Sequence, residues 1–458
     1  MRRAIYHFYF VDDVYLPNIV FRFLLVSLNI EAILGEVTIH QRRKKLKEMT
    51  QGNGLGDAYT ATLGRLKAQK GNKSILGWKV LMWVLYSERP LRADELCHAL
   101  GVETGSTDLN MENVLELRIL VASCLGLVTV EASSSTVRLV HFTLQEHLLS
   151  NPTLVHSPHS AIAEVCLTYL NFRCVWDLSP TLWPAPATTP LLEYASVYWG
   201  RHTRRGMTEN IKKLSLRLLD RFEEHISAQL LLLCGNWDRS GGPYYFRMGV
   251  STGFTGLHGA AFLGIAAILS AVLGMKEWDV NAGGCMGMTA LTWASRGGHE
   301  EVVKMLLERD DVNPDQADTQ YGCTPLLWAA KNGDEGIVNM LLEREDFNPN
   351  QPDTKSGRAP LSWAAEKGYD GIVKMLLQRE VNSDQVDTDY GQTPLSLAAG
   401  NGHEMVVNML LGREDVDPDQ ADTSYGRTPL SWAAKNGHEG IVKTLLQREV
   451  NPNRADVG

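Results

Sequence analysis

The stretch that decides the fold reads Thr324-Pro-Leu-Leu-Trp-Ala-Ala-Lys-Asn-Gly-Asp-Glu-Gly-Ile-Val-Asn-Met-Leu-Leu342. Thr324 supplies a hydroxyl that can cap a helix, and Pro325 suits the first helical position because no backbone donor is lost there. Gly333 tolerates the left-handed conformation that ends many helices. The residues after it place Ile337, Val338, Met340, Leu341 and Leu342 on one apolar stripe. The stretch therefore predicts two short helices joined by a tight turn, with an apolar face that neither can bury alone.

The same pattern occurs six times in the second half of the chain. Its opening position falls at Thr255, Thr289, Thr324, Ala359, Thr393 and Thr428, with spacings of 34, 35, 35, 34 and 35 residues. Stacked copies would join their apolar stripes into one continuous core. The pattern resembles the ankyrin repeat. The turn-rich segments between helix pairs, such as residues 313–322, are interpreted as β-hairpin fingers.

A different organisation precedes the repeats. Apolar patterning predicts helices at 78–86, 94–100 and 113–124, strands at 127–131 and 136–142, and a helix at 144–149. Three helices followed by a hairpin is the element order of a winged helix. A second helical region follows, with helices expected at 161–172 and 211–234 and a proline-rich loop at 178–190 between them.

The winged-helix segment also carries a family resemblance. It is carried by Trp83, Arg89-Pro90-Leu91, Asp94-Glu95-Leu96, Ala99-Leu100, Cys124-Leu-Gly-Leu-Val128 and His141-Phe-Thr-Leu-Gln-Glu146. These residues resemble the winged helix that follows the NACHT nucleotide-binding module in fungal NLR-like proteins, often described as the winged helix of GPI inositol-deacylase. Phe21–Leu25 and Tyr59–Leu66 are similar to the tail of that NACHT module.

The resemblance implies a nucleotide-hydrolysing module upstream, but its phosphate-binding motif G-x-x-x-x-G-K-[ST] is not found in this sequence. The nearest string, Gly71-Asn72-Lys73-Ser74, lacks the glycine directly before the lysine and a preceding strand. We therefore expect no cofactor, and a chain that resembles the sensor half of such a receptor without its NTPase module.

These observations predict a mainly α fold: an ankyrin-repeat solenoid of helix-turn-helix units with β-hairpin fingers, preceded by a winged-helix-like α+β domain and a helical adaptor. The expected boundaries are 1–70 for a helical N-terminal segment, 71–151 for the winged helix, 152–250 for the adaptor and 251–458 for six ankyrin repeats.

Composition narrows the function. The 458 residues include 44 Lys and Arg against 53 Asp and Glu, a formal net charge of −9, which disfavours general attraction to nucleic acid or anionic lipid. Seven scattered cysteines without a C-x-x-C pair are typical of reduced thiols, so a cytoplasmic or nuclear location is expected. Charged residues interrupt the apolar stretch Ile19–Leu34, so no membrane span is expected.

Several motifs point to chemistry that their context does not support. Gly249-Val-Ser251-Thr-Gly253 matches the nucleophile elbow of esterases, but no alternating βα pattern surrounds it. His299, His403 and His438 each precede a glutamate, yet valine stands where H-E-x-x-H requires the second histidine. The basic run 40–47 fits a solvated helix face, and the predicted recognition helix carries more acid than base.

The leading hypothesis is a non-catalytic scaffold or NLR-like sensor that binds a protein partner, with no catalytic residue, metal or small-molecule substrate. The expected contact residues vary from copy to copy; they are Tyr321, Arg358, Tyr390, Gln392, Tyr425 and Arg427 in the fingers, and Arg296, Lys331, Glu366, Asn401 and Lys435 on the helices. Alternatively the tyrosines only pack between fingers. The finger acids, Asp315 and Asp318 among them, either attract a basic partner or are merely solvated. The rival functions are a remnant of a signal-transducing NTPase, a hydrolase using Ser251, and a transcription-associated regulator using the winged helix.

Overall fold

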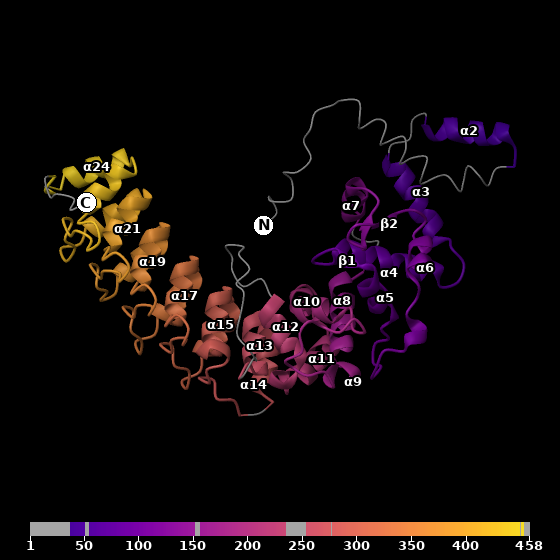
Figure 1. Ribbon diagram of the computed structural model, residues 1–458, viewed down its shortest axis with the longest axis horizontal. Coiled ribbons are helices and arrows are strands. Elements are labelled where there is room, and N and C mark those ends of the chain that lie inside the picture. Colours follow the sequence, from indigo (N-terminus) through magenta and orange to yellow (C-terminus); the bar gives the residue numbers. More distant parts are fainter. Residues whose placement is uncertain are drawn as a thin grey trace. The chain divides into compact units, whose positions relative to one another are not determined.

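The computed structural model describes residues 37–50, 55–151, 156–234, 253–275, 277–448 and 450–452. The chain forms two compact units (Figure 1). One comprises Met1–Asp177 and Trp183–Ile211, and the other comprises Leu178–Leu182 and Lys212–Gly458. No helix among the described residues is long and apolar enough to cross a membrane.

The first unit contains the winged helix. Its helices are α3 (Leu55–Lys67), α4 (Lys73–Tyr86), α5 (Ala93–Gly101), α6 (Leu117–Ser123) and α7 (Phe142–Leu149), and α2 (Ile39–Thr50) comes before them. The strands β1 (Leu91–Arg92), β2 (Val128–Glu131) and β3 (Thr136–Leu139) form an antiparallel sheet in the order β1-β3-β2. Trp83, Leu96 and Leu120 are buried beneath it. The predicted order of three helices and a hairpin is confirmed.

Two details of the winged helix differ from the prediction. The third helix begins at Leu117 and not near residue 113, because Glu116 is extended and the preceding Met111–Asn113 is a separate 3-10 turn, η1. The third strand, β1, was not predicted, since only two residues pair with β3, through Leu91 opposite Val137.

The helices after the winged helix are α8 (Pro158–Leu170), α9 (Arg173–Trp176), α10 (Leu192–Arg205), α11 (Glu209–Leu219), the 3-10 turn η3 (Phe222–Glu224) and α12 (Ile226–Cys234). Within the first unit α8 packs along α10, a helix that the sequence analysis missed. The single helix expected at 211–234 is two helices. His225 separates them, because its ring nitrogen accepts the Ser227 N–H at 3.1 Å and so caps α12.

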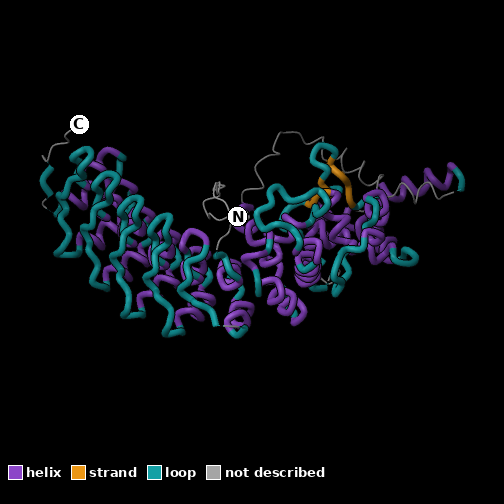
Figure 2. Tube along the Cα trace, turned by 60° about the horizontal axis from the view of Figure 1, so that its bottom comes forward, coloured by secondary structure: helices purple, strands orange, loops and turns teal. Residues whose placement is uncertain are grey.

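Six helix pairs follow in the second unit, as predicted (Figures 1 and 2). The first helices are α13 (Gly256–Leu263), α15 (Ala290–Gly297), α17 (Pro325–Asn332), α19 (Pro360–Lys367), α21 (Pro394–Asn401) and α23 (Pro429–Lys435). The second helices are α14 (Ala266–Leu273), α16 (Glu300–Leu307), α18 (Glu335–Leu342), α20 (Asp370–Leu377), α22 (Glu404–Leu411) and α24 (Glu439–Leu446). Thr324 caps α17 by accepting the Leu327 N–H at 3.2 Å, and Gly333 ends it at φ +80°.

The fingers differ from the expected β-hairpins. The described finger residues form turns and no strand (Figure 2). In the finger before α17, one backbone bond joins Asp318 N–H to the Cys323 carbonyl at 3.0 Å. The Asp318 carboxylate accepts the N–H groups of Gln320 and Tyr321 at 3.0 and 2.6 Å. A side chain thus satisfies the donors that a strand ladder would otherwise use.

A chain of Asn and Asp side chains links consecutive fingers. Each accepts the backbone N–H of a residue in the next repeat, at 2.7 Å in the first four links and 3.0 Å in the last. The acceptors of this Asx ladder are Asn281, Asp315, Asn350, Asp384 and Asp419. The ladder adds directional bonds to the apolar contacts that stack the repeats.

Candidate partner-binding surface

Four of the six first helices carry a tryptophan at one fixed position, where α13 has Gly259. Trp293, Trp328, Trp363 and Trp432 occupy it in α15, α17, α19 and α23. Leu397 takes the same position in α21. Cations from the next turn lie over these rings, so we call the surface that they form the tryptophan face.

Cations and indole rings alternate along the tryptophan face. The Arg296 guanidinium lies 4.4 Å from the centre of the Trp328 ring, and the Lys331 ammonium lies 3.9 Å from that of Trp363. Lys435 lies 4.8 Å from Trp432. Contacts of this kind favour a cation over an aromatic face. Burial between the rings lowers the pKa of Lys331.

Aspartates in the fingers hold three of these indoles in place. The Trp328, Trp363 and Trp432 N–H groups donate to Asp318, Asp353 and Asp422 at 3.0, 2.9 and 2.8 Å. Each aspartate precedes its tryptophan by ten residues.

These aspartates are among the finger acids that, from the sequence alone, could have attracted a basic partner. Asp318, Asp353 and Asp422 are 3, 4 and 3% exposed, so their charge is internal. Burial alone would raise the pKa of Asp353, but hydrogen bonds from Ser356 and Trp363 outweigh it and lower that pKa. Asp315, in the Asx ladder, is also engaged within the array. The finger acids therefore give no reason to expect a basic partner.

In the repeat with Leu397, the buried finger aspartate is bonded by an arginine instead of an indole. Asp387 stands where the other fingers carry the buried aspartate, and no indole reaches it. The Arg358 guanidinium, one repeat earlier, takes that role and donates to Asp387 Oδ2 through Nε at 3.1 Å and through a terminal nitrogen at 3.0 Å. Its other terminal nitrogen lies 3.2 Å from Glu366.

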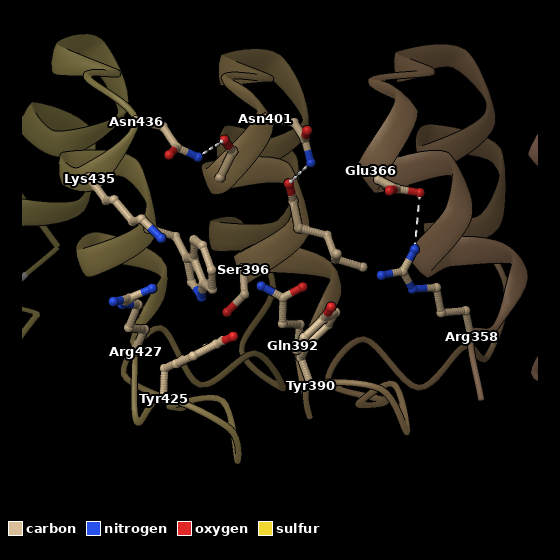
Figure 3. A pocket seen from close by; sticks show the side chains of 13 residues that line it. Arg358, Glu366, Tyr390, Gln392, Ser396, Asn401, Tyr425, Arg427, Lys435 and Asn436 are labelled. Atoms are coloured by element: carbon tan, nitrogen blue, oxygen red, sulfur yellow. Dashed lines mark hydrogen bonds and ion pairs between the residues drawn. The ribbon is translucent and has the colours of Figure 1, made fainter. Parts of the chain in front are cut away.

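The structure brings together eight of the eleven predicted contact residues. They line one hollow of about 530 Å³ on the tryptophan face (Figure 3). These eight are Arg358, Glu366, Tyr390, Gln392, Asn401, Tyr425, Arg427 and Lys435. Ser396, Leu397, Gly400, Trp432 and Asn436 complete the lining, and sequence reasoning missed all five. The remaining predicted residues do not line the hollow: Tyr321 and Arg296 contact Trp328, and Lys331 lies between Trp328 and Trp363.

The eight residues do not offer equal access to a partner. Arg358 and Gln392 are each only 9% exposed, so they support the surface more than they present it. Tyr390 and Tyr425 are 44 and 41% exposed. Their rings stack with centres 6.3 Å apart and planes 20° apart. Tyr390 and Tyr425 therefore pack against each other and still present ring surface to solvent.

The motifs set aside earlier are placed consistently where they are described. His299, His403 and His438 each use Nε2 to contact a backbone carbonyl of the preceding repeat, at 2.9, 2.9 and 3.1 Å. Over the described part of the chain no cluster of three metal-ligating side chains occurs. Gly71 to Ser74 joins α3 to α4 and follows a helix, not a strand. Ser251 and the segment Phe21–Leu25 lie outside the described residues.

Comparison with known proteins identifies both parts of the chain. The family described as "Ankyrin repeats (3 copies)" matches residues 227–318, 310–387 and 361–456. The family described as "GPI inositol-deacylase, winged helix domain" matches residues 65–162. The "Azaphilone pigments biosynthesis cluster protein L" of Monascus ruber is 29% identical over 279 residues, which are 50% of this chain and 54% of that protein. The chain thus spans about half the length of this curated relative.

These matches confirm the resemblances to the ankyrin repeat and to the winged helix of GPI inositol-deacylase. The ankyrin matches run from residue 227 to residue 456, about half of the chain, and they include all six helix pairs. With its repeats stacked on one another and a winged helix of the GPI inositol-deacylase type ahead of them, this chain belongs to the ankyrin-repeat family.

Proposed function

We propose that the chain is a non-catalytic scaffold whose tryptophan face binds a protein partner. The observation that carries this proposal is the hollow, because it gathers eight residues that vary among the repeats, while the core positions behind them are nearly constant. Exposed aromatic and cationic side chains around a recess are typical of the residues that dominate protein interfaces.

The second part of the proposal is an NLR-like sensor role, in which the winged helix transmits or supports the contact made by the repeats. The order of a winged helix of this type followed by an ankyrin array supports it. Four of the described cysteines, Cys97, Cys124, Cys166 and Cys323, are buried thiols, which supports the proposed cytoplasmic location.

Capture of the partner by the full chain tests this proposal. The tagged protein is incubated with extract of the cells that express it, and bound proteins are quantified by mass spectrometry. Replacing both Tyr390 and Tyr425 by alanine should reduce one specific partner about tenfold or more, the effect of losing an aromatic anchor. The control is Lys374→Glu, on the exposed side of α20 and away from the tryptophan face. Equal recovery with all three proteins would refute the proposed surface.

A further inference from the structure

The hollow lies where α21 lacks the tryptophan that its neighbours α19 and α23 carry. Two positions of α21 differ from their counterparts in the neighbouring repeats. Leu397 replaces the tryptophan, and Gly400 stands where α19 has Glu366 and α23 has Lys435. The recess of about 530 Å³ lies beside both residues. It falls within the size range of sites that enclose a small ligand or a large side chain, roughly 300–1,000 Å³.

The walls of the hollow combine aromatic surface with positive charge. Trp432, Tyr390 and Tyr425 supply the rings. Arg427 lies 4.8 Å from the Tyr425 ring and 5.1 Å from the Trp432 ring, and Lys435 lies on the same indole. The carboxylate that lines the hollow, Glu366, contacts Arg358. Aromatic rings attract further rings in edge-on or offset geometry, at centre distances of about 4.5–7 Å.

We infer that the hollow receives an aromatic side chain from an extended acidic segment of the partner. The aromatic ring would fill the place of the missing tryptophan, between Leu397 and the rings of Tyr425 and Trp432. Carboxylates beside it would face Lys435 and Arg427, and farther along the face Lys331. This inference rests on the proposed function, since it specifies what the tryptophan face recognises.

Two observations favour this occupant over others. A basic segment would meet the Lys435 ammonium with like charge, while the finger acid Asp422 is turned inward and bonded to Trp432. A purely aliphatic segment would cover the side-chain amide of Gln392 without offering it a partner. An acidic segment with one ring meets the charge and the aromatic walls together.

The test measures fluorescence polarisation of labelled peptides on the full chain. The probe is a fluorescein-labelled peptide GEDWEDG, with GEDAEDG and GKKWKKG as comparison peptides. We expect the first to bind at least about tenfold more tightly than either of the others, as expected for one aromatic anchor and for charge matching. Its affinity should fall as salt rises, because part of the attraction is between partly exposed charges.

Two variants fill the hollow from inside. Leu397→Trp restores the missing indole, and Gly400→Lys extends a side chain into the recess. A Cβ at Gly400 would lie 3.6 Å from Trp432, an ordinary contact, so the fold should tolerate this change. Both variants should weaken GEDWEDG binding about tenfold. The matched control Gly400→Ala leaves the space open and should bind as the wild type does. Thermal melts by circular dichroism verify that each variant is folded.

The Gly400→Lys variant separates filling from charge, because the added cation alone would strengthen binding of an acidic peptide. Equal binding of GEDWEDG and GEDAEDG, tighter binding of GKKWKKG, undiminished binding by Leu397→Trp, or no binding of GEDWEDG would each overturn the inference. If one of these occurs while capture of the natural partner still requires Tyr390 and Tyr425, the proposed function stands and the acidic aromatic occupant is wrong. If capture does not require the tyrosines, the proposed function itself fails.

Discussion

Replacing Arg358 by alanine should unfold part of the array more easily, because it leaves a buried carboxylate without its cation. Asp387 has a fully buried side chain, and that of Arg358 is 10% exposed. Removing one partner of a buried ion pair typically costs about 3–5 kcal/mol. Asp387 keeps the N–H groups of Tyr390 and Gly391 at 2.9 Å each. We therefore expect the lower end of that range, about 3 kcal/mol.

Urea denaturation followed by intrinsic fluorescence measures this loss. With a slope of about 1–3 kcal/mol per molar urea, the midpoint should fall by about 1 M or more. Because long repeat arrays can lose cooperativity, hydrogen exchange of the amides near Asp387 should accompany the melt and show faster exchange there. The matched control is Arg309→Ala. Arg309 forms an exposed ion pair with Asp311, so its removal should cost clearly less.

A rescue experiment sharpens the same prediction. In the Arg358→Ala background, Leu397→Trp should recover part of the lost stability, because an indole there can donate to Asp387 as Trp432 donates to Asp422 at 2.8 Å. A double-mutant cycle would then show a favourable coupling of about 1 kcal/mol or more. The reasoning is refuted if Arg358→Ala is no more destabilising than Arg309→Ala, or if the effects of Arg358→Ala and Leu397→Trp are simply additive.

Three further predictions concern other contacts. Burial lowers the pKa of His202 from 6.5 to about 4. Between pH 6.5 and pH 4 this histidine therefore binds a proton in the unfolded chain but not in the folded one, and its contribution to the free energy of unfolding should fall by about 3 kcal/mol as the pH drops through this range. His202→Gln should abolish that dependence in urea melts, and an unchanged pH profile would contradict the assignment. Asp384→Ala should remove one bond of the Asx ladder and cost about 1 kcal/mol in thermal melts, whereas Asp384→Asn keeps the acceptor and should cost far less; equal losses would exclude a role for that bond. Gly368→Ala should reduce the free energy of unfolding more than Gly437→Ala. Both glycines have positive φ, at +69° and +77°, which alone costs an alanine about 1–2 kcal/mol, but only a Cβ at position 368 would lie 2.3 Å from His403. Equal melting temperatures of the two variants would show that the His403 contact is irrelevant.

The repeat architecture could be predicted from the sequence because its signals are local. A threonine hydroxyl, a following proline and a glycine such as Gly333 each define a helix end, and six copies at nearly constant spacing leave little ambiguity. The grouping of the proposed contact residues could be predicted in part for the same reason, since positions that vary while the core repeats fall on one side of each repeat. Eight of them do meet in one hollow.

The parts that escaped prediction depend on contacts between distant residues. The finger acids were open to interpretation as solvated charges because nothing within one finger shows that Asp318 bonds to Trp328. The recurring interval of ten residues between aspartate and tryptophan was a usable signal, and so was its interruption at Leu397. The bond from Arg358 to Asp387 spans 29 residues and had no such signal. The helix α10 was missed because it directly follows a proline-rich loop. The strand β1 was missed because it has only two residues.

The link from Arg358 to Asp387 also limits how the array can change length. Three of the repeats carry an aspartate bonded to a tryptophan ten residues later, as Asp318 is to Trp328. A repeat of this kind that is inserted or lost by recombination would meet a compatible neighbour on either side. At α21 this interchangeability fails. A unit inserted between Arg358 and Asp387 would leave the aspartate facing Leu397 without the cation that neutralises it. Here the two adjoining repeats must be inherited together.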